Sequence, residues 1–270
     1  MPKLSAGLCL ALSLLLAAAH PGAAAEDPGD ALRRAASAGD LAKVKALLAA
    51  GVDVNAANTY GGTALAFAAD KGRLEVVNLL LERGAAVNVK DSFYGATPLV
   101  WAVSHGHAEI ARALLAKGAE GEAEALTSAA GDGHGAVVKV ILERGKLGPE
   151  RLGDALATAT QRQQKEVVAL LEAAGAKPPV AVAVDPAVLK TYEGAYDGEG
   201  FSLTVALKDG KLVVTSDNGN FTLAAADPVT FRFEEFAGLK VVFQVEEGKV
   251  RGMTFHRGER TTPLKKRETP

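Results

Sequence analysis

Four glycine pairs, each with a spacing of twelve residues, follow one another along the first part of this chain, and they constrain the fold more than any other feature. A fifth copy has Gln163 in place of the first glycine. Each pair encloses a short apolar run such as Val77–Leu81. The pairs are Gly39/Gly51, Gly72/Gly84, Gly106/Gly118 and Gly133/Gly145, with Gln163/Gly175 as the fifth. Internal repetition on this scale predicts a stack of similar units and excludes a single enclosed core.

Each unit carries the signals of two short helices separated by a turn. Nine residues before the first glycine lies a residue that we expect to cap the first helix, because its side-chain oxygen can accept a free backbone amide. These residues are Asp30, Thr63, Thr97, Glu124 and Asp154, all but Glu124 being good N-cap residues, and two positions after each comes a leucine. The second glycine follows the apolar run, where a left-handed residue commonly ends a helix.

These motifs resemble the ankyrin repeat. Thr97-Pro98-Leu99 is similar to the start of that family's Thr-Pro-Leu-His motif, with Val100 in place of His. Gly72–Val77 and Gly106–Ile110 are similar to its Gly-His-x-Glu-Val-Val turn, and Gly51–Asn55 and Gly84–Asn88 to Gly-Ala-Asp-Val-Asn. The step from Thr63 to Thr97 is 34 residues, against a family period of about 33. The resemblance covers residues 28–176 and implies a helical solenoid of about five repeats.

By the same resemblance, the stretch after each second glycine forms a finger that overhangs a concave binding face. The next expected cap lies twelve residues after Gly51 and thirteen after Gly84, but only six after Gly118 and nine after Gly145. We therefore expect two full fingers. The fourth and fifth repeats, with contracted loops, are expected to contribute packing and capping more than recognition.

A partner-binding site is predicted on the second and third repeats. The resemblance places a variable, groove-facing position five residues before the first glycine, and Phe67 and Trp101 occupy it. Aromatic side chains are common interface anchors. The predicted site comprises Tyr60, Phe67, Phe93, Tyr94 and Trp101, with a polar rim of Asp70, Lys71, Ser104 and His105. The alternative is that Phe67 and Trp101 fill gaps between neighbouring first helices.

The sequence changes character after Gly175. Lys177-Pro178-Pro179 cannot continue a helix, so residues 177–186 are expected to form a linker that ends in the cap of a short helix at Asp185-Pro186. Apolar residues then alternate with a period of two. Turn signals separate them at Asp209-Gly210, Asn218-Gly219, Glu247-Gly248 and Arg257-Gly258. This pattern predicts about eight antiparallel strands closed as a small barrel over residues 187–268. With the repeats over residues 26–176, the predicted class is α+β in two domains, which we expect to fold as separate units.

The C-terminal segment resembles the lipocalin-like module attached to serine-β-lactamase-like and penicillin-binding proteins. The motifs that carry this resemblance are Tyr192–Tyr196, Asp209–Leu212 and Gly252–Gly258. The catalytic Ser-x-x-Lys motif that usually accompanies the module does not occur in the sequence. A barrel of this size either holds a small apolar ligand or fills its interior with side chains. We expect the filled interior.

Residues 1–25 are predicted to be a signal peptide. Lys3, the apolar stretch Leu4–Ala19 and Ala23-Ala24-Ala25 before Glu26 form a basic start, an apolar centre and a cleavage site. A membrane anchor is the alternative, but the stretch is short for a span of about 20 residues. Cleavage after Ala25 removes Cys9, the only cysteine. An export signal without a disulfide framework favours a bacterial periplasmic protein over a eukaryotic secreted one, so we expect a periplasmic or secreted bacterial protein.

Charge and motif content narrow the function classes. A net charge of −2 and the lack of a basic stripe with interleaved aromatics give no reason to expect nucleic acid as a partner. His105-Gly106-His107 lacks the spacing and companions of a metal site. No catalytic residue and no cofactor is predicted. The chain is expected to be a non-enzymatic monomer, peripheral to a membrane at most, that binds a protein through its concave face. The alternative is a carrier of a small apolar ligand or lipid in the barrel.

Overall fold

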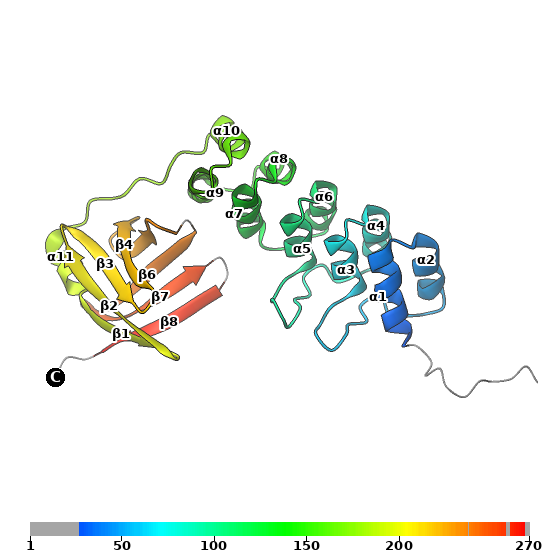
Figure 1. Cartoon of the computed structure of the whole chain (residues 1–270), viewed down its shortest axis with the longest axis horizontal. Coiled ribbons are helices and arrows are strands. Elements are labelled where there is room, and N and C mark those ends of the chain that lie inside the picture. Colours follow the sequence, from blue (N-terminus) through cyan, green and yellow to red (C-terminus); the bar gives the residue numbers. More distant parts are fainter. Residues whose placement is uncertain (1–26, 237, 258–259, 268–270) are drawn as a thin grey trace, which may run out of the picture.

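The computed structural model describes residues 27–236, 238–257 and 260–267 of this chain. The predicted signal peptide, with Cys9, lies outside the described residues. Figure 1 shows an array of paired helices followed by a barrel of strands. The fold therefore has the α+β composition that the sequence predicts, with helical repeats first and a closed antiparallel barrel second.

The described helical region forms five helix pairs. The first helices are α1 (Pro28–Ala38), α3 (Ala64–Asp70), α5 (Pro98–Ser104), α7 (Glu122–Asp132) and α9 (Pro149–Gln161). The second helices are α2 (Leu41–Ala49), α4 (Leu74–Glu82), α6 (Ala108–Ala116), α8 (Gly135–Arg144) and α10 (Lys165–Ala173). The leucine that follows each expected cap by two positions is buried in every repeat, and these leucines belong to one apolar core that runs through the array.

The glycine pattern has the backbone conformation that the sequence predicts. The glycine that ends each repeat is left-handed, with φ between 63° at Gly145 and 87° at Gly118. The first glycine of each repeat is left-handed too, and Gln163 adopts φ 59° in its place in the fifth repeat. The repeat is therefore preserved in the backbone even where the glycine is not.

The expected helix caps are confirmed in two repeats and wrong in three. Thr63 and Thr97 accept backbone N–H groups of Ala66 and Val100, each at 3.3 Å. The other three expected caps lie inside helices, because α1, α7 and α9 begin earlier, after Asp27, Gly121 and Gly148. The three misassigned residues are Asp30, Glu124 and Asp154. Where a full finger precedes the helix, the chain stays extended up to the threonine. Where no finger precedes it, the helix gains a turn.

Two sets of side-chain hydrogen bonds tie each repeat to the next. In the first set, the residue that follows the first glycine of one repeat contacts a backbone carbonyl of the preceding repeat. That carbonyl lies two positions before the first glycine of its own repeat. The pairs are Arg73 with Ser37, His107 with Asp70, His134 with Ser104 and Gln164 with Gly131, at 3.0–3.2 Å. In the second set, Asn55 accepts the N–H of Ala86 at 2.8 Å and Asn88 that of Glu120 at 3.0 Å. The asparagine of the finger motif therefore bonds to the next repeat.

The barrel follows the short helix α11 (Pro186–Thr191), whose cap is Asp185 as predicted. Its strands are β1 (Gly194–Gly198), β2 (Phe201–Lys208), β3 (Lys211–Ser216), β4 (Gly219–Ala225), β5 (Thr230–Phe233), β6 (Leu239–Glu246), β7 (Lys249–Arg257) and β8 (Arg260–Lys266). Each strand pairs with the next, and β1 pairs with β8 to close the barrel. The turn expected at Asn218-Gly219 lies one residue earlier, because Gly219 already pairs with Ser216. Gly258, in the expected last turn, lies outside the described residues.

Aromatic side chains fill the barrel interior next to α11. The rings of Tyr192 and Phe243 stack with centroids 4.1 Å apart, and Phe231 contacts both at 5.5–5.6 Å. The hydroxyl of Tyr196 donates to Tyr192 O at 2.8 Å and that of Tyr192 to Pro228 O at 2.9 Å. These buried rings are packed and hydrogen-bonded, in agreement with the filled interior that we expected.

Residues 177–185 join the two parts without a helix or strand. Val182 N–H donates to Ala225 O of β4 at 2.8 Å, while Val180 is 80% exposed. In Figure 1 this segment runs from α10 along the barrel to α11, and the barrel lies beside the α7 and α9 end of the array. Within the described residues, no helix has the length and apolar character needed to cross a membrane.

Candidate functional site

Each finger is shaped by one side chain that caps its own loop. Asn58 Oδ1 accepts the N–H groups of Tyr60 and Gly62 at 2.9 and 2.8 Å. In the next finger, Asp91 Oδ1 accepts those of Phe93 and Tyr94 at 3.0 and 2.6 Å. Such turns fix the backbone locally. The fingers also contact each other, because Ser92 N–H donates to Tyr60 O at 2.8 Å.

A row of rings leads from the second finger to the turn after α5. Phe93 and Tyr94 meet edge to face at 4.6 Å between centroids, and Tyr94 meets Trp101 of α5 in the same way at 5.5 Å. His105 continues the row, stacked on Trp101 at 6.5 Å. Phe93 is 71% and Tyr94 59% exposed. We call Phe93, Tyr94, Trp101 and His105 the aromatic row.

Trp101 makes polar contacts through its indole ring and through its backbone carbonyl. Its indole N–H donates to Asp91 Oδ2 at 3.2 Å, and its carbonyl oxygen lies 3.1 Å from His105 Nδ1. The side chain is half-buried. Trp101 therefore packs against its own finger, through Tyr94 and Asp91, and its side chain stays partly exposed.

The polar rim residues divide into two groups. Asp70 is central, because its carboxylate lies 3.1 Å from Lys71 Nζ and 3.4 Å from His105 Nδ1. These contacts link α3 to the turn after α5. Ser104 instead donates its hydroxyl to Val100 O at 2.7 Å, within its own helix. Asp70, Lys71 and His105 thus lie together beside the aromatic row, while the Ser104 hydroxyl is engaged locally.

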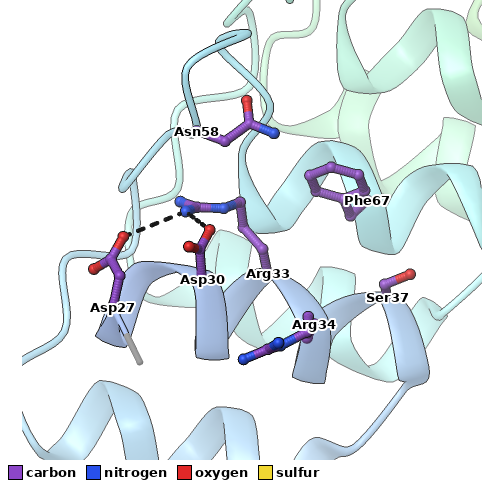
Figure 2. Close-up of a pocket in the computed structure, with 7 residues that line it drawn as sticks. All are labelled: Asp27, Asp30, Arg33, Arg34, Ser37, Asn58 and Phe67. Carbon is purple, nitrogen blue, oxygen red and sulfur yellow. Dashed lines mark hydrogen bonds and ion pairs between the residues drawn. The ribbon is translucent and has the colours of Figure 1, made fainter. Parts of the chain in front are cut away.

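Phe67 lies in a different environment from Trp101. It lines an open pocket of about 410 Å³ between α1, α3 and the first finger (Figure 2). The other lining residues are Asp27, Asp30, Arg33, Arg34, Ser37 and Asn58. Tyr60 lies on the first finger and is 62% exposed. The predicted site therefore has two parts, the aromatic row with its rim and the Phe67 pocket with Tyr60 beside it.

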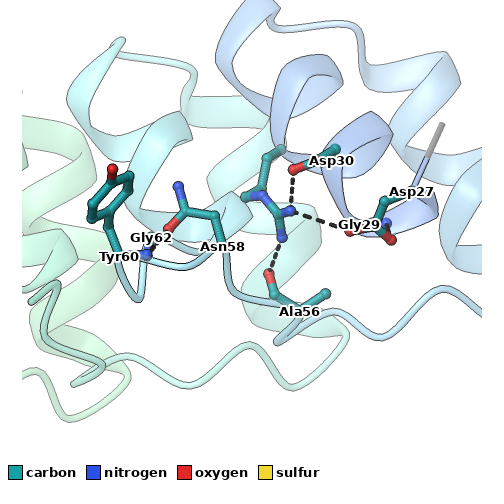
Figure 3. Close-up of polar contacts among 8 residues, drawn as sticks. Asp27, Gly29, Asp30, Ala56, Asn58, Tyr60 and Gly62 are labelled. Carbon is teal, nitrogen blue, oxygen red and sulfur yellow. Dashed lines mark hydrogen bonds and ion pairs between the residues drawn. The ribbon is translucent and has the colours of Figure 1, made fainter.

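Arg33 organises the wall of the pocket. Its guanidinium pairs with Asp30, lies 3.6 Å from Asp27 Oδ2, and donates to Ala56 O at 2.9 Å (Figure 3). The Arg33 side chain is 7% exposed. A buried guanidinium with two carboxylates and a carbonyl ties α1 to the first finger, so this network is structural. Asp30 serves this ion pair in place of the capping role expected for it.

Sequence reasoning missed Asn58, Asp91 and Arg33. A signal for the first two exists, because each is an Asn or Asp that lies five or six residues before the threonine cap. For Arg33 the sequence shows only the i,i+3 spacing from Asp30, which exposed helix pairs share, and it does not show the contact with Ala56, 23 residues away. Among the described residues, no group of three or more His, Cys, Asp or Glu side chains could hold a metal ion.

Comparison with known proteins bears on the helical part. The family described as ankyrin repeats (3 copies) matches residues 7–91 and 32–125. The crystal structure of the human ASB11 ankyrin repeat domain is similar, at 31% sequence identity and a TM-score of 0.49, over 54% of this chain and 69% of that one. No curated protein sequence matches the chain. The lipocalin-like resemblance of residues 187–268 stays a prediction. The family match agrees with the glycine, threonine and asparagine motifs, and the chain therefore contains ankyrin repeats.

Proposed function

We propose that this chain is an exported, non-enzymatic protein that binds a protein partner through the first three repeats of its concave side. Stacked repeats build extended concave surfaces that suit protein partners. The observation that carries the proposal is the aromatic row, which presents Phe93 and Tyr94 to solvent on a finger fixed by Asp91.

The geometry of the row favours tight binding. Exposed aromatic groups on a soluble protein commonly mark an interaction site. Asp91 accepts three hydrogen bonds from the finger and from Trp101, so the loop is ordered before a partner arrives. Ordering in advance lowers the entropic cost of association. Asp70, Lys71 and His105 supply charged and polar groups at the edge of the row.

The test compares partner binding with folding. Phe93→Ala with Tyr94→Ala removes two exposed rings, so the melting temperature should change little. Loss of interface anchors typically costs about 2 kcal/mol or more, roughly thirtyfold in affinity. Partners captured from a periplasmic extract by the wild-type chain are purified and titrated against both proteins. Phe201→Ala, at a 41% exposed ring of the barrel, is the matched control and should bind like the wild type.

Trp101→Ala separates the binding role of Trp101 from its packing role. Lost affinity with an unchanged melt supports an anchor, whereas a large fall in melting temperature makes Trp101 a residue of the fold alone. If the double finger variant and the wild type bind every purified partner equally, the proposed surface is wrong.

Export is proposed from the composition of residues 1–25, which lie outside the described part of the chain. N-terminal sequencing of the protein from fractionated cells should find Glu26 first. An intact Met1 in the cytoplasm would contradict export and leave the binding surface untouched. We do not extend the proposal to a ligand carrier, because packed aromatic side chains occupy the barrel interior beside α11.

A further inference from the structure

Two pairs of like charges face each other between the array and the barrel. Glu150 and Asp154 lie one turn apart on α9, a spacing at which like charges destabilise a helix. Arg232 of β5 and Lys240 of β6 are directly opposite in the strand register, where like charges are also unfavourable. Each pair therefore repels within its own domain, and contact with the oppositely charged pair of the other domain offsets that repulsion.

The distances match this reciprocal arrangement. Arg232 Nε lies 3.3 Å from Asp154 Oδ1 and its Nη2 lies 3.5 Å from Glu150 Oε1, while Lys240 Nζ lies 3.9 Å from that same Glu150 oxygen. The side chains of Asp154, Arg232 and Lys240 are only 16–28% exposed. We call these four residues the charge quartet.

Further contacts extend the interface along α9 and onto α7. The side-chain amide of Gln161 donates to Glu235 O in the loop between β5 and β6. A Cβ at Gly238 in that loop would lie 3.6 Å from Thr127 Cγ2 on α7. The barrel therefore lies against the first helices of the fourth and fifth repeats, as Figure 1 also shows.

The short loops before α7 and α9 leave space for this contact. The fourth and fifth repeats have no full finger, and α7 and α9 begin a turn early. The linker crosses α9 at Gly153, where a Cβ would lie 2.8 Å from Lys177 O, so this crossing requires glycine. The two repeats that lack a full finger, and that we expected to contribute less to recognition, are thus the two that the barrel contacts.

The charge quartet determines where the barrel lies on the array more than it stabilises the contact between them. Burial raises the pKa of Asp154 while Arg232 opposes that rise, so desolvation offsets much of the attraction, as is usual for ion pairs removed from water. We propose that the barrel is a releasable occupant of the fourth and fifth repeats, registered by the charge quartet. When docked, it confines any partner of the concave side to the first three repeats. The docking itself does not depend on the proposed partner.

Charge exchange tests the docking. Dyes attached at Lys117→Cys and Lys249→Cys on a Cys9→Ser background report the distance between array and barrel by energy transfer. At about 0.05 M salt, Glu150→Lys with Asp154→Lys should lower the transfer, and so should Arg232→Glu with Lys240→Glu. Combining all four substitutions should restore it. Glu75→Lys with Glu82→Lys on α4, the same change of charge at exposed positions, should leave transfer unchanged.

Salt should act in the same direction, lowering transfer in the wild type at about 1 M, where surface electrostatics are screened. Melting curves of each variant show whether both parts are folded. Unchanged transfer in both one-sided variants, or no recovery in the four-fold exchange, would overturn the proposal.

Discussion

At the scale of single residues, Gln163 carries a conformation that suits glycine. Its φ of 59° lies in the left-handed region, where the other four repeats have glycine. For residues with a Cβ this region costs roughly 1–2 kcal/mol. We expect Gln163→Gly to raise the free energy of unfolding of the array by about 1 kcal/mol in urea titrations. Ala169→Gly, at an exposed position in the middle of α10, is the control and should lower it by a similar amount.

Two buried tyrosines link the barrel to pH. Burial raises the pKa of Tyr192 and Tyr196 above 10.0. Below pH about 10 these tyrosines are protonated in both the folded and the unfolded chain, and the stability of the barrel is at its full value. As the pH rises above about 10, the unfolded chain releases these protons more readily than the folded barrel, and this stability is lost. The free energy of unfolding of the barrel should then fall by up to ~1.4 kcal/mol per pH unit for each tyrosine.

Denaturant titrations between pH 9 and about 11.5 check this dependence. Tyr196→Phe removes one of the two groups and should roughly halve the slope, whatever it does to stability at neutral pH. Tyr60→Phe, at an exposed finger position, should leave the slope as it is. A barrel whose stability does not change with alkaline pH would contradict the role assigned to these hydroxyls.

At the scale of elements, the finger asparagine is a tie between repeats. Asn88 accepts Glu120 N–H and donates to Gly118 O at 3.2 Å. Asn88→Ala should therefore destabilise the array by about 1–2 kcal/mol, at roughly 1 kcal/mol for each hydrogen bond. Faster hydrogen exchange at the Glu120 amide would locate the effect. Asn78→Ala, on the exposed face of α4, should be neutral or slightly stabilising. Equal effects of the two variants would rule out a special role for Asn88.

The elements were largely predictable from sequence, because their signals are local. The period of twelve between glycines, the Asp185-Pro186 helix start and the alternation around Val241 and Phe243 each depend on neighbours within one element. Asp154 was misassigned because α9 begins five residues earlier, after Gly148, where no full finger holds the chain extended. Its ion pair with Arg232 was missed for a different reason, since Arg232 is far away in the sequence and a pattern of local spacing cannot contain that contact. The residues of the aromatic row were predicted one by one, but the contacts between their rings were not, because the finger geometry that Asp91 fixes was missed.

At the scale of the whole molecule, we expect the two parts to unfold separately. The charged and polar contacts between them are few beside the apolar core within each. Thermolysin, which cuts before apolar residues, should cleave first near Val180 and leave two resistant fragments. Calorimetry of the intact chain should give two transitions. A single transition, or protection of the linker, would mean that the barrel acts as an obligatory cap of the fifth repeat.

The pairing of the first strand of the barrel with the last has a consequence of a different kind. Tyr196 of β1 is opposite Lys266 of β8, and Arg267 N–H donates to Ala195 O at 2.8 Å. The chain thus enters and leaves the strand ladder at adjacent points. Units with adjacent ends tolerate insertion and circular permutation. A barrel of this kind can therefore be joined to an unrelated domain without a change in the fold of either. The domain that accompanies it in a given protein then reflects gene fusion as much as any requirement of folding.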